Sequence, residues 1–410
     1  MRIAQVCPYD IDRAGGVQVH ARDTAAALAE LGHEVTIIAP RASSRGAPAA
    51  GGGPIAGPDA PRIRRLGRAR MVNFGGTRFE TSFAAGDDRR ELEALMRGGR
   101  FDVVHFHTPW TPFMATQAFL ACTAARVVTF HDTPPERSAG ALSRNVLGLI
   151  GRAVLSTVDG VIAVSDAPRA HLRPRAGQSV SIIPPCTDLR RFAGAAPRPA
   201  SPGAPVTILF VGRLEPRKGV MVLLKAYRML CAEGHNVRLV IGGGGREEAA
   251  LRQFVTEHAL PGVEFLGAFD DAEAPDLFAG CDIFCAPSLY GESFGVVLAE
   301  AMAAGKPVVA AANRGYRTVM QGEAEPFLAE AGDEISLHER LRRLVQDPVL
   351  RTRLGDWGRS TAMQYDSRTV APRLLAVYAE AIAHREARMG GAALPAAIEP
   401  SAAYQNLTAP

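Results

Sequence analysis

The sequence predicts an α/β protein built from two doubly wound domains, each a parallel sheet with helices on its faces. Short apolar segments of strand length alternate with amphipathic helical segments along nearly the whole chain. The strand segments are continuously apolar, which indicates burial on both faces of a sheet. At 410 residues the chain is also too long for one ordinary hydrophobic core. Together these observations favour two similar domains in series.

The first run of alternating segments covers residues 1–190. Strands are expected at residues 3–6, 35–39, 103–106, 127–130, 160–164 and 181–183. A helix over residues 17–31 separates the first two strands, and Gly32 follows it as a residue suited to ending a helix. We therefore predict an N-terminal Rossmann-like domain over residues 1–190.

A proline-rich segment interrupts the pattern near the middle of the chain. Residues 193–205 contain four prolines and two glycines, a composition that supports neither a helix nor a central strand. We predict a linker over residues 191–205 and a second domain over residues 206–367. The strands of this domain are expected at residues 207–211, 238–241, 264–266, 283–286 and 307–311.

Three segments depart from the alternation. A helix over residues 368–389 is expected to pack back on the N-terminal domain. Residues 390–410 lack periodicity and are expected to form a disordered tail. Residues 41–61 are rich in Gly, Ala, Pro and Ser, which predicts a mobile loop.

Composition excludes several classes of protein. Hydrophobic residues make up 47% and charged residues 21%, which is typical of a globular chain. The formal net charge of +4 is far below that of a dedicated nucleic-acid binder, so we expect no nucleic-acid partner. Six scattered cysteines, no apolar run of about 18 residues and no signal-peptide pattern predict a cytoplasmic protein.

The first candidate motif is the pair Gly15 and Gly16, between the first expected strand and its helix. Glycines let the backbone approach a ligand closely, and the amides at a helix N-terminus favour an anion. The dinucleotide fingerprint Gly-x-Gly-x-x-Gly is absent. A simple tight turn explains this pair equally well.

The second candidate motif follows the first strand of the second domain. It places Arg213 and Lys218 in the loop at the carboxyl end of that strand, where open α/β sheets bind ligands. A guanidinium and an ammonium group together suit a pyrophosphate. A solvated basic loop is the alternative.

The third candidate motif contains two carboxylates, Glu292 and Glu300, eight residues apart. Ser293 is expected to be the N-cap of a helix that ends at Gly305. Eight residues are about two helical turns, so the two carboxylates are expected on one face of this helix. A solvated charged face is the alternative, but the helix is otherwise apolar, and carboxylates are seldom buried without a purpose.

In this combination and order the motifs resemble the retaining family 4 glycosyltransferases of GT-B architecture. Within that family the chain resembles the bacterial phosphatidylinositol mannosyltransferase-like enzymes. The family hallmark is Glu-x7-Glu, here Glu292 and Glu300, and the resemblance extends over about residues 1–385. It implies two Rossmann-like domains that face a central cleft.

The resemblance also implies roles for individual residues. Glu292 would hold hydroxyls of the donor sugar, Glu300 those of the ribose, and Arg213 and Lys218 would neutralise the departing diphosphate. The residues implied in catalysis are His131, Glu292, Arg213 and Lys218. Those implied in donor binding are Gly15, Gly16, Ser293, Phe294, Gly295 and Glu300. Tyr9, Asp12 and Gln18 are implied on the acceptor side.

The expected function is therefore retaining, metal-independent transfer of a hexose from a nucleotide sugar, with mannose from GDP-mannose preferred. The acceptor is expected to be a glycan, a lipid-linked molecule or a small molecule. A sugar-phosphate synthase and a non-catalytic nucleotide-sugar-binding protein are the alternatives. No cofactor is expected. His105, His107 and His131 have the residue type of metal ligands, but no locally spaced carboxylate or thiol completes a site, and His131 alone also fits a buried structural histidine.

Three features bear on the acceptor and the membrane. Pro185 and Cys186 stand where family members commonly have Asn-Gly, and Glu136 stands where the phosphatidylinositol enzymes have a basic residue. The second difference disfavours a phosphoinositide acceptor. Five arginines, Arg62, Arg64, Arg65, Arg68 and Arg70, predict reversible contact with the anionic inner face of a membrane, and a solvated basic loop is the alternative.

Overall fold

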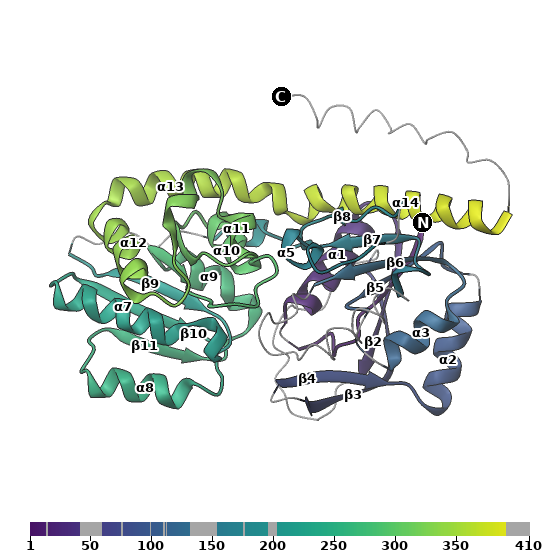
Figure 1. Ribbon diagram of the computed structural model, residues 1–410, viewed down its shortest axis with the longest axis horizontal. Coiled ribbons are helices and arrows are strands. Elements are labelled where there is room, and N and C mark those ends of the chain that lie inside the picture. Colours follow the sequence, from purple (N-terminus) through teal and green to yellow (C-terminus); the bar gives the residue numbers. More distant parts are fainter. Residues whose placement is uncertain are drawn as a thin grey trace.

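The structure is a computed structural model that describes residues 1–13, 15–41, 60–74, 77–98, 100–109, 111, 113–131, 154–174, 177–195 and 203–390. Two α/β units lie side by side, and a long C-terminal helix lies along the N-terminal unit (Figure 1). Each unit has its own sheet. The predicted fold class is confirmed.

The N-terminal sheet has eight strands in the order β4-β3-β2-β1-β5-β6-β7-β8. All neighbouring pairs are parallel except β3 and β4, which form an antiparallel hairpin at one edge. The strands are β1 (Arg2–Val6), β2 (Glu34–Arg41), β3 (Arg62–Phe74), β4 (Thr77–Phe83), β5 (Val103–His107), β6 (Ala125–Phe130), β7 (Gly160–Ala163) and β8 (Ser181–Ile182).

The C-terminal sheet has six parallel strands in the order β11-β10-β9-β12-β13-β14. The strands are β9 (Val206–Val211), β10 (Val237–Gly242), β11 (Val263–Gly267), β12 (Ile283–Ala286), β13 (Val308–Ala311) and β14 (Leu328–Ala329). Every strand expected from the sequence is present in the two sheets, with ends shifted by one or two residues.

The helices cover the faces of both sheets. Those of the N-terminal unit are α1 (Gly16–Glu30), α2 (Gly86–Arg97), α3 (Met114–Ala121), α5 (Asp166–Arg169) and α6 (Arg190–Ala193). Those of the C-terminal unit are α7 (Val220–Ala232), α8 (Glu248–Glu257), α9 (Ala274–Ala279), α10 (Val296–Ala303), α11 (Tyr316–Val319), α12 (Glu334–Gln346) and α13 (Pro348–Ala362). Short 3-10 helices are Pro216–Lys218, Asp271–Glu273, Gly322–Phe327 and Met363–Tyr365, and α14 (Ser367–Gly390) ends the described chain.

The β3–β4 hairpin corrects the expectation for the arginine-rich segment, which was not expected to form a strand. Arg68 and Arg70 on β3 are exposed, whereas Leu66 and Ala69 on the same strand are buried. Gly67 has a φ of 80°, a conformation that suits glycine at an irregular strand position. The sequence does not reveal this strand because its charged residues interrupt the apolar pattern.

The chain crosses between the two units twice, at neighbouring positions. The amide of Ser367 donates to the carbonyl of Thr187 at 2.9 Å, and the amide of Leu189 donates to Asp366 Oδ2 at 3.1 Å. The short helix α6 occupies the start of the segment that composition predicts to be a linker. In the C-terminal part of this predicted linker, the structure describes only residues 203–205. The two segments that cross between the units are therefore held together by these hydrogen bonds.

Helix α14 packs back on the N-terminal unit (Figure 1). Val370, Leu374 and Tyr378 share one hydrophobic core with Ile3 and Val127 of the N-terminal sheet. Tyr378 is fully buried, and its hydroxyl lies 2.7 Å from His105 Nδ1 on β5. The last helix is therefore part of the N-terminal core.

Several expectations concern residues outside the described ranges. These are most of the predicted mobile loop, residues 42–59, the acceptor-side position Glu136, and the predicted tail, residues 391–410. Among the described residues, no helix is both long and apolar enough to cross a membrane.

We predict that Tyr378→Phe lowers the free energy of unfolding by about 1–3 kcal/mol, because it leaves a buried His105 nitrogen without its partner. Urea unfolding followed by circular dichroism measures this change. Tyr290→Phe is the matched control, since Tyr290 is 56% exposed. Equal stability of both variants and the wild type would contradict a structural role for this hydrogen bond.

Candidate active site

The residues singled out from the sequence gather at the carboxyl ends of the strands in both units. In the N-terminal unit they follow β1 and β6, and in the C-terminal unit they follow β9 and β12. The hydroxyl of Ser165, after β7, donates to the carbonyl of Ser293, after β12. This bond brings the two carboxyl-terminal edges together, which is where open α/β sheets bind ligands.

The loop after β9, residues 212–219, is held tightly against the loop after β12. Gly219 has a φ of 70°, and a Cβ atom there would lie 2.2 Å from the carbonyl oxygen of Pro287. The amide of Leu289 donates to the carbonyl of Arg217 at 2.7 Å. Only glycine fits this close approach, so the sequence Arg-Lys-Gly places two cations beside the second loop.

Glu292 is the centre of a charged network between these loops. Its Oε1 accepts from Lys218 Nζ at 2.8 Å and from Arg217 Nη1 at 3.0 Å. Arg217 also donates to Glu215 at 3.1 Å, and Glu215 pairs with Arg213 at 2.8 Å. Burial lowers the pKa of Lys218, and the Glu292 carboxylate opposes that shift. The structure thus brings Glu292 and Lys218 into contact and links Arg213 to them.

Arg217 was not singled out in the sequence, although it contacts Glu292 directly. Its position beside Lys218, in the loop after a strand, could have identified Arg217 as a candidate from the sequence. What the sequence did not show is which of the three cations in this loop would reach the carboxylate.

The prediction that one helix carries both carboxylates on one face is wrong, because the helix starts later than expected. Helix α10 begins at Val296, and its N-cap is Gly295 with a φ of 104°, so Ser293 is not the N-cap. Glu292 therefore lies before the helix and points to the cations of the other loop. The left-handed conformation of Gly295 takes the preceding residues off the helix axis, which a count of residues per turn does not reveal.

Glu300 lies on α10 in a different environment from Glu292. Burial raises the pKa of Glu300 to about 8, and Asp271 adds to this shift while Arg191 opposes it. Arg191 pairs with Asp271 at 2.6 Å. Asp23, on α1 of the N-terminal unit, also acts on Glu300, and burial raises its own pKa to about 6. Asp23, Asp271 and Glu300 therefore form a group of carboxyl side chains from both units, next to the crossing segments.

Ser293, Phe294 and Gly295 lie between the two carboxylates. Phe294 is only 4% exposed and packs edge-on against Tyr365, with the ring centroids 5.1 Å apart. Its side chain therefore belongs to the core, and only its backbone faces the loop. This is consistent with the expected contribution of backbone amides from this segment.

The glycine pair of the N-terminal unit lies at the start of α1. Gly15 is the N-cap, and Gly16 is the first helical residue. Gly16 is exposed, and a Cβ atom there would meet no atom within 4 Å among the described residues. Gly16 therefore leaves free space beside the start of a helix with 15 residues, and a helix N-terminus favours an anion.

The three acceptor-side residues occupy the same loop and helix start. The hydroxyl of Tyr9 lies 3.4 Å from Thr111 Oγ1, and Asp12 pairs with Arg65 of β3 at 2.7 Å. Gln18 is buried, and its side chain lies against Gly15. Buried Glu80 on β4 anchors this loop by accepting from the amide of Asp10 at 2.7 Å. The hairpin that the sequence did not predict therefore supports the acceptor-side loop.

His131 follows β6 and belongs to a cluster of histidines. Its Nε2 lies 3.1 Å from His107 Nδ1, and His107 Nε2 lies 3.0 Å from Gln5 Oε1. His20 of α1 stacks edge-on against His131, with the ring centroids 4.9 Å apart. Burial lowers the pKa of His20 to about 4 and holds the pKa values of His107 and His131 well below their usual range.

The cluster has the residue types of a zinc site, but its hydrogen bonds do not suit one. Ligand atoms of His20, His107 and His131 lie within 4.8 Å of one another. The amide of Cys186 donates to His20 Nδ1 at 2.7 Å, so the neutral His20 ring carries its proton on Nε2. A metal-bound histidine instead donates its second N–H to an acceptor. Both ring nitrogens of His105 also have hydrogen-bond partners, the hydroxyls of Tyr378 and Thr129.

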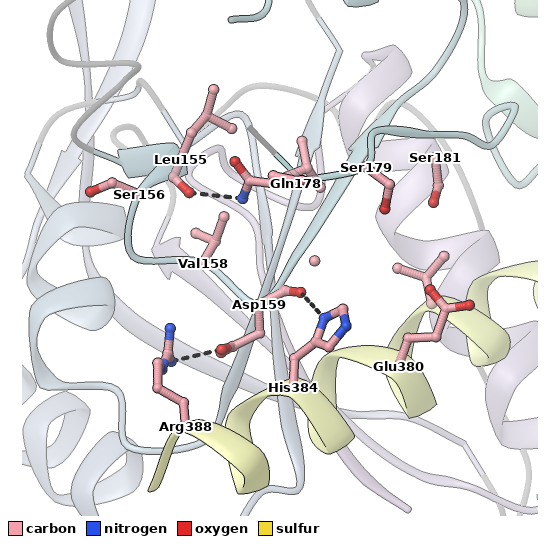
Figure 2. Close-up of a pocket in the computed structure, with 14 residues that line it drawn as sticks. Leu155, Ser156, Val158, Asp159, Gln178, Ser179, Ser181, Glu380, His384 and Arg388 are labelled. Atoms are coloured by element: carbon pink, nitrogen blue, oxygen red, sulfur yellow. Dashed lines mark hydrogen bonds and ion pairs between the residues drawn. The ribbon is translucent and has the colours of Figure 1, made fainter. Parts of the chain in front are cut away.

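Two further features do not contribute site residues. The glycines of residues 242–245 pack on the loop after β9, since a Cβ atom at Gly243 would lie 2.0 Å from the carbonyl oxygen of Gly212. A cavity of about 380 Å³ lies between the segment before β7 and helix α14, and Asp159, His384 and Arg388 line it (Figure 2). Asp159 precedes β7, so this cavity is at the amino-terminal edge of the sheet and away from the predicted residues.

Two family models match the chain. The model described as Glycosyltransferase Family 4 matches residues 14–191. The model described as Glycosyl transferases group 1 matches residues 196–361.

Full-length relatives agree with these matches. A phosphatidyl-myo-inositol mannosyltransferase of Mycobacterium leprae is 32% identical over 381 residues, which cover 92% of this chain and 96% of the relative. A D-inositol 3-phosphate glycosyltransferase of Xylanimonas cellulosilytica is 30% identical and covers 92% of this chain and 94% of the relative.

A solved structure shows the same fold. Anabaena HepE in complex with UDP and glucose superposes with a TM-score of 0.70 at 18% identity, over 92% of this chain and 99% of that one. The two matched models lie on the two α/β units described above. On these grounds the chain belongs to the family 4 glycosyltransferases and is a hexosyltransferase of the GT-B fold.

Proposed function

We propose that this enzyme transfers mannose from GDP-mannose to a phosphorylated inositol, with retention of the anomeric configuration and without a metal ion. The names of two relatives support the acceptor, because one contains phosphatidyl-myo-inositol and the other D-inositol 3-phosphate. Their shared chemistry is an inositol ring that carries a phosphate, and these two names outweigh the single difference at Glu136, which disfavours a phosphoinositide and lies outside the described residues. The first of these names also supports mannose as the transferred sugar.

The observation that carries the chemistry is the pairing of Glu292 with Lys218 and Arg217. A nucleotide sugar that loses its sugar builds up negative charge on the diphosphate. Preorganised cations and backbone amides stabilise that charge in a site shielded from water. In this proposal Lys218 and Arg213 of the C-terminal unit and the helix start at Gly16 of the N-terminal unit supply such groups, while Glu292 accepts hydrogen bonds from sugar hydroxyls.

Retention needs no protein nucleophile in this proposal. The leaving phosphate takes the proton of the acceptor hydroxyl on the same face of the sugar from which it departs. His131 lies against His107 and His20, whose pKa values burial lowers, so both rings are neutral at pH 7. A neutral His131 suits hydrogen bonding to the sugar better than it suits the role of a charged acid.

Turnover of sugar nucleotides tests this function. We expect the wild type to release GDP from GDP-mannose faster when an inositol phosphate is present. Glu292→Ala should slow this release about 30- to 1000-fold, because a lost charged contact costs about 2–4 kcal/mol in such a site. Glu339→Ala, an exposed carboxylate on α12, is the matched control and should keep full activity.

Near-wild-type turnover by Glu292→Ala would contradict the assignment of the site. Turnover only with a sugar phosphate as acceptor would favour the synthase alternative, and no turnover of any nucleotide sugar would favour a binding protein. The same assay run with EDTA tests metal independence. If EDTA stops turnover and Mg²⁺ or Mn²⁺ restores it, the proposal of a metal-free reaction is wrong.

We predict that affinity for GDP rises about tenfold between pH 7 and pH 9. The pKa of about 8 keeps Glu300 mostly protonated at pH 7, whereas ribose hydroxyls donate to the carboxylate form. Calorimetric titration at several pH values measures the change. Glu300→Gln keeps the other titrating groups and should bind more weakly at pH 9, with a flatter pH profile. The same rise in wild type and Glu300→Gln would rule out Glu300 as its source.

Contact with an anionic membrane through the arginine-rich strand is part of the proposal. Three of its arginines have carboxylate partners, since Arg62 pairs with Glu34, Arg64 with Glu91 and Arg65 with Asp12. Exposed Arg68 and Arg70 continue the strand. Pairing reduces the charge that the strand offers to lipid, so any binding should be weak and sensitive to salt.

We predict that changing Arg64, Arg68 and Arg70 to Ser reduces sedimentation with liposomes that contain anionic lipid at low salt. Each basic residue near such a surface contributes about 1 kcal/mol. The matched control changes Arg228, Arg342 and Arg353, exposed arginines of the C-terminal unit, to Ser. Equal binding by the two triple variants would show that the strand is not the contact.

A further inference from the structure

A line of hydrogen-bonded side chains leads from the middle of the N-terminal sheet to His131. Gln5 lies on β1, His107 on β5 and His131 directly after β6, and these three strands are neighbours in the sheet. Gln5 is in register with His105, so its side chain shares a face with His105 and His107. The distances along the line are 3.0 Å from Gln5 to His107 and 3.1 Å from His107 to His131.

The atoms in this line determine where the protons are. Gln5 presents its Oε1 to His107, and an amide oxygen only accepts a hydrogen bond. Gln5 Nε2 is buried and has no hydrogen-bond partner among the described residues. With the amide in this orientation, His107 carries its proton on Nε2, which leaves Nδ1 as an acceptor. His131 Nε2 faces that acceptor and must donate to it. A neutral His131 then has its unprotonated nitrogen at Nδ1.

Burial limits the partners that these groups can have. Gln5 and His107 are both fully buried, so water does not offer the His107 ring an alternative partner. The pKa values of His107 and His131 lie well below their usual range because of burial and the neighbouring histidines, so both rings are neutral. A neutral imidazole has one donor and one acceptor, so each bond in the line fixes the next.

His20 lies on the other side of the histidine cluster, and a backbone hydrogen bond determines which of its ring nitrogens carries the proton. The backbone amide of Cys186 donates to His20 Nδ1 at 2.7 Å, which leaves the His20 proton on Nε2. A backbone amide cannot reverse its direction. The ring of His20 lies edge-on to both His107 and His131, at centroid distances of 5.2 and 4.9 Å. This contact restrains the His131 ring without competing for its acceptor.

We propose that Gln5 and His107 are positioning residues that hold His131 as the Nε2–H tautomer, so that Nδ1 accepts a hydrogen bond from a sugar hydroxyl. The part that concerns the sugar rests on the proposed function. The part that concerns the tautomer is a property of the unliganded protein. The two parts are therefore tested separately.

The tautomer is read from long-range ¹H–¹⁵N correlation spectra of protein labelled with ¹⁵N-histidine. These spectra distinguish Nε2–H, Nδ1–H and doubly protonated rings, and His131→Asn assigns the resonance of interest by its loss. We expect the Nε2–H pattern for His131 in the wild type at pH 7. An Nδ1–H or doubly protonated pattern would overturn the proposal.

Paired variants test the two positioning residues. His107→Asn keeps an amide that can accept from His131, so it should retain the Nε2–H pattern. Gln5→Leu and His107→Leu remove the acceptors at both positions, so His131 should shift to a mixture of tautomers. An unchanged His131 pattern in both leucine variants would overturn the proposal. Unshifted resonances of His33 and His258, far along the chain, show that a variant is folded.

Kinetics with the sugar nucleotide then test the consequence. The leucine variants should lower kcat about five- to tenfold with little change in KM for the donor, and His107→Asn should recover most of it. Equal loss in the leucine variants and in His107→Asn would indicate a merely structural role. If the spectra behave as expected but no sugar nucleotide is turned over by the wild type, the tautomer assignment stands and the proposed function fails.

Discussion

The contact between Lys218 and Glu292 is the interaction on which the C-terminal half of the site depends. It joins the loop after β9 to the loop after β12, two neighbouring strands of one sheet. The close approach of Gly219 to Pro287 and the amide bond from Leu289 to Arg217 hold the same two loops. Because the loops are fixed before any donor arrives, little ordering is left to be done on binding, and preorganised charge is most effective in that case.

The two units supply different electrostatic environments to the site. The C-terminal unit brings Arg213, Lys218 and Glu292 as a network of opposite charges. The N-terminal unit brings a histidine cluster that burial keeps neutral. This division fits transfer from a nucleotide sugar, in which the phosphate side develops negative charge and the sugar side needs directed hydrogen bonds. Ser165 joins the two environments through the carbonyl of Ser293.

The errors of the sequence analysis have one physical origin. Glu292 and Glu300 were placed on one helix because residue spacing assumes a continuous helix, whereas Gly295 turns the chain before Val296. The strand β3 was missed because its arginines pair with carboxylates from other segments and carry no apolar pattern. Arg217 and His20 were missed because their partners, Glu292 and Cys186, are far along the chain. A local pattern of residues along the sequence does not reveal contacts between residues that are far apart in the chain.

The sequence by itself determined the two α/β domains, the positions of all described strands except β3, β4 and β14, and the loops that hold the candidate residues. These follow from apolar segments and glycines, whose effect is local and therefore readable along the chain. Only the tertiary structure decided which cation reaches Glu292, which way the protons of the histidines point and what surrounds Glu300. Each of these depends on groups that are distant in sequence and become neighbours only when parallel strands bring their carboxyl ends to one edge, as Gln5, His107 and His131 show.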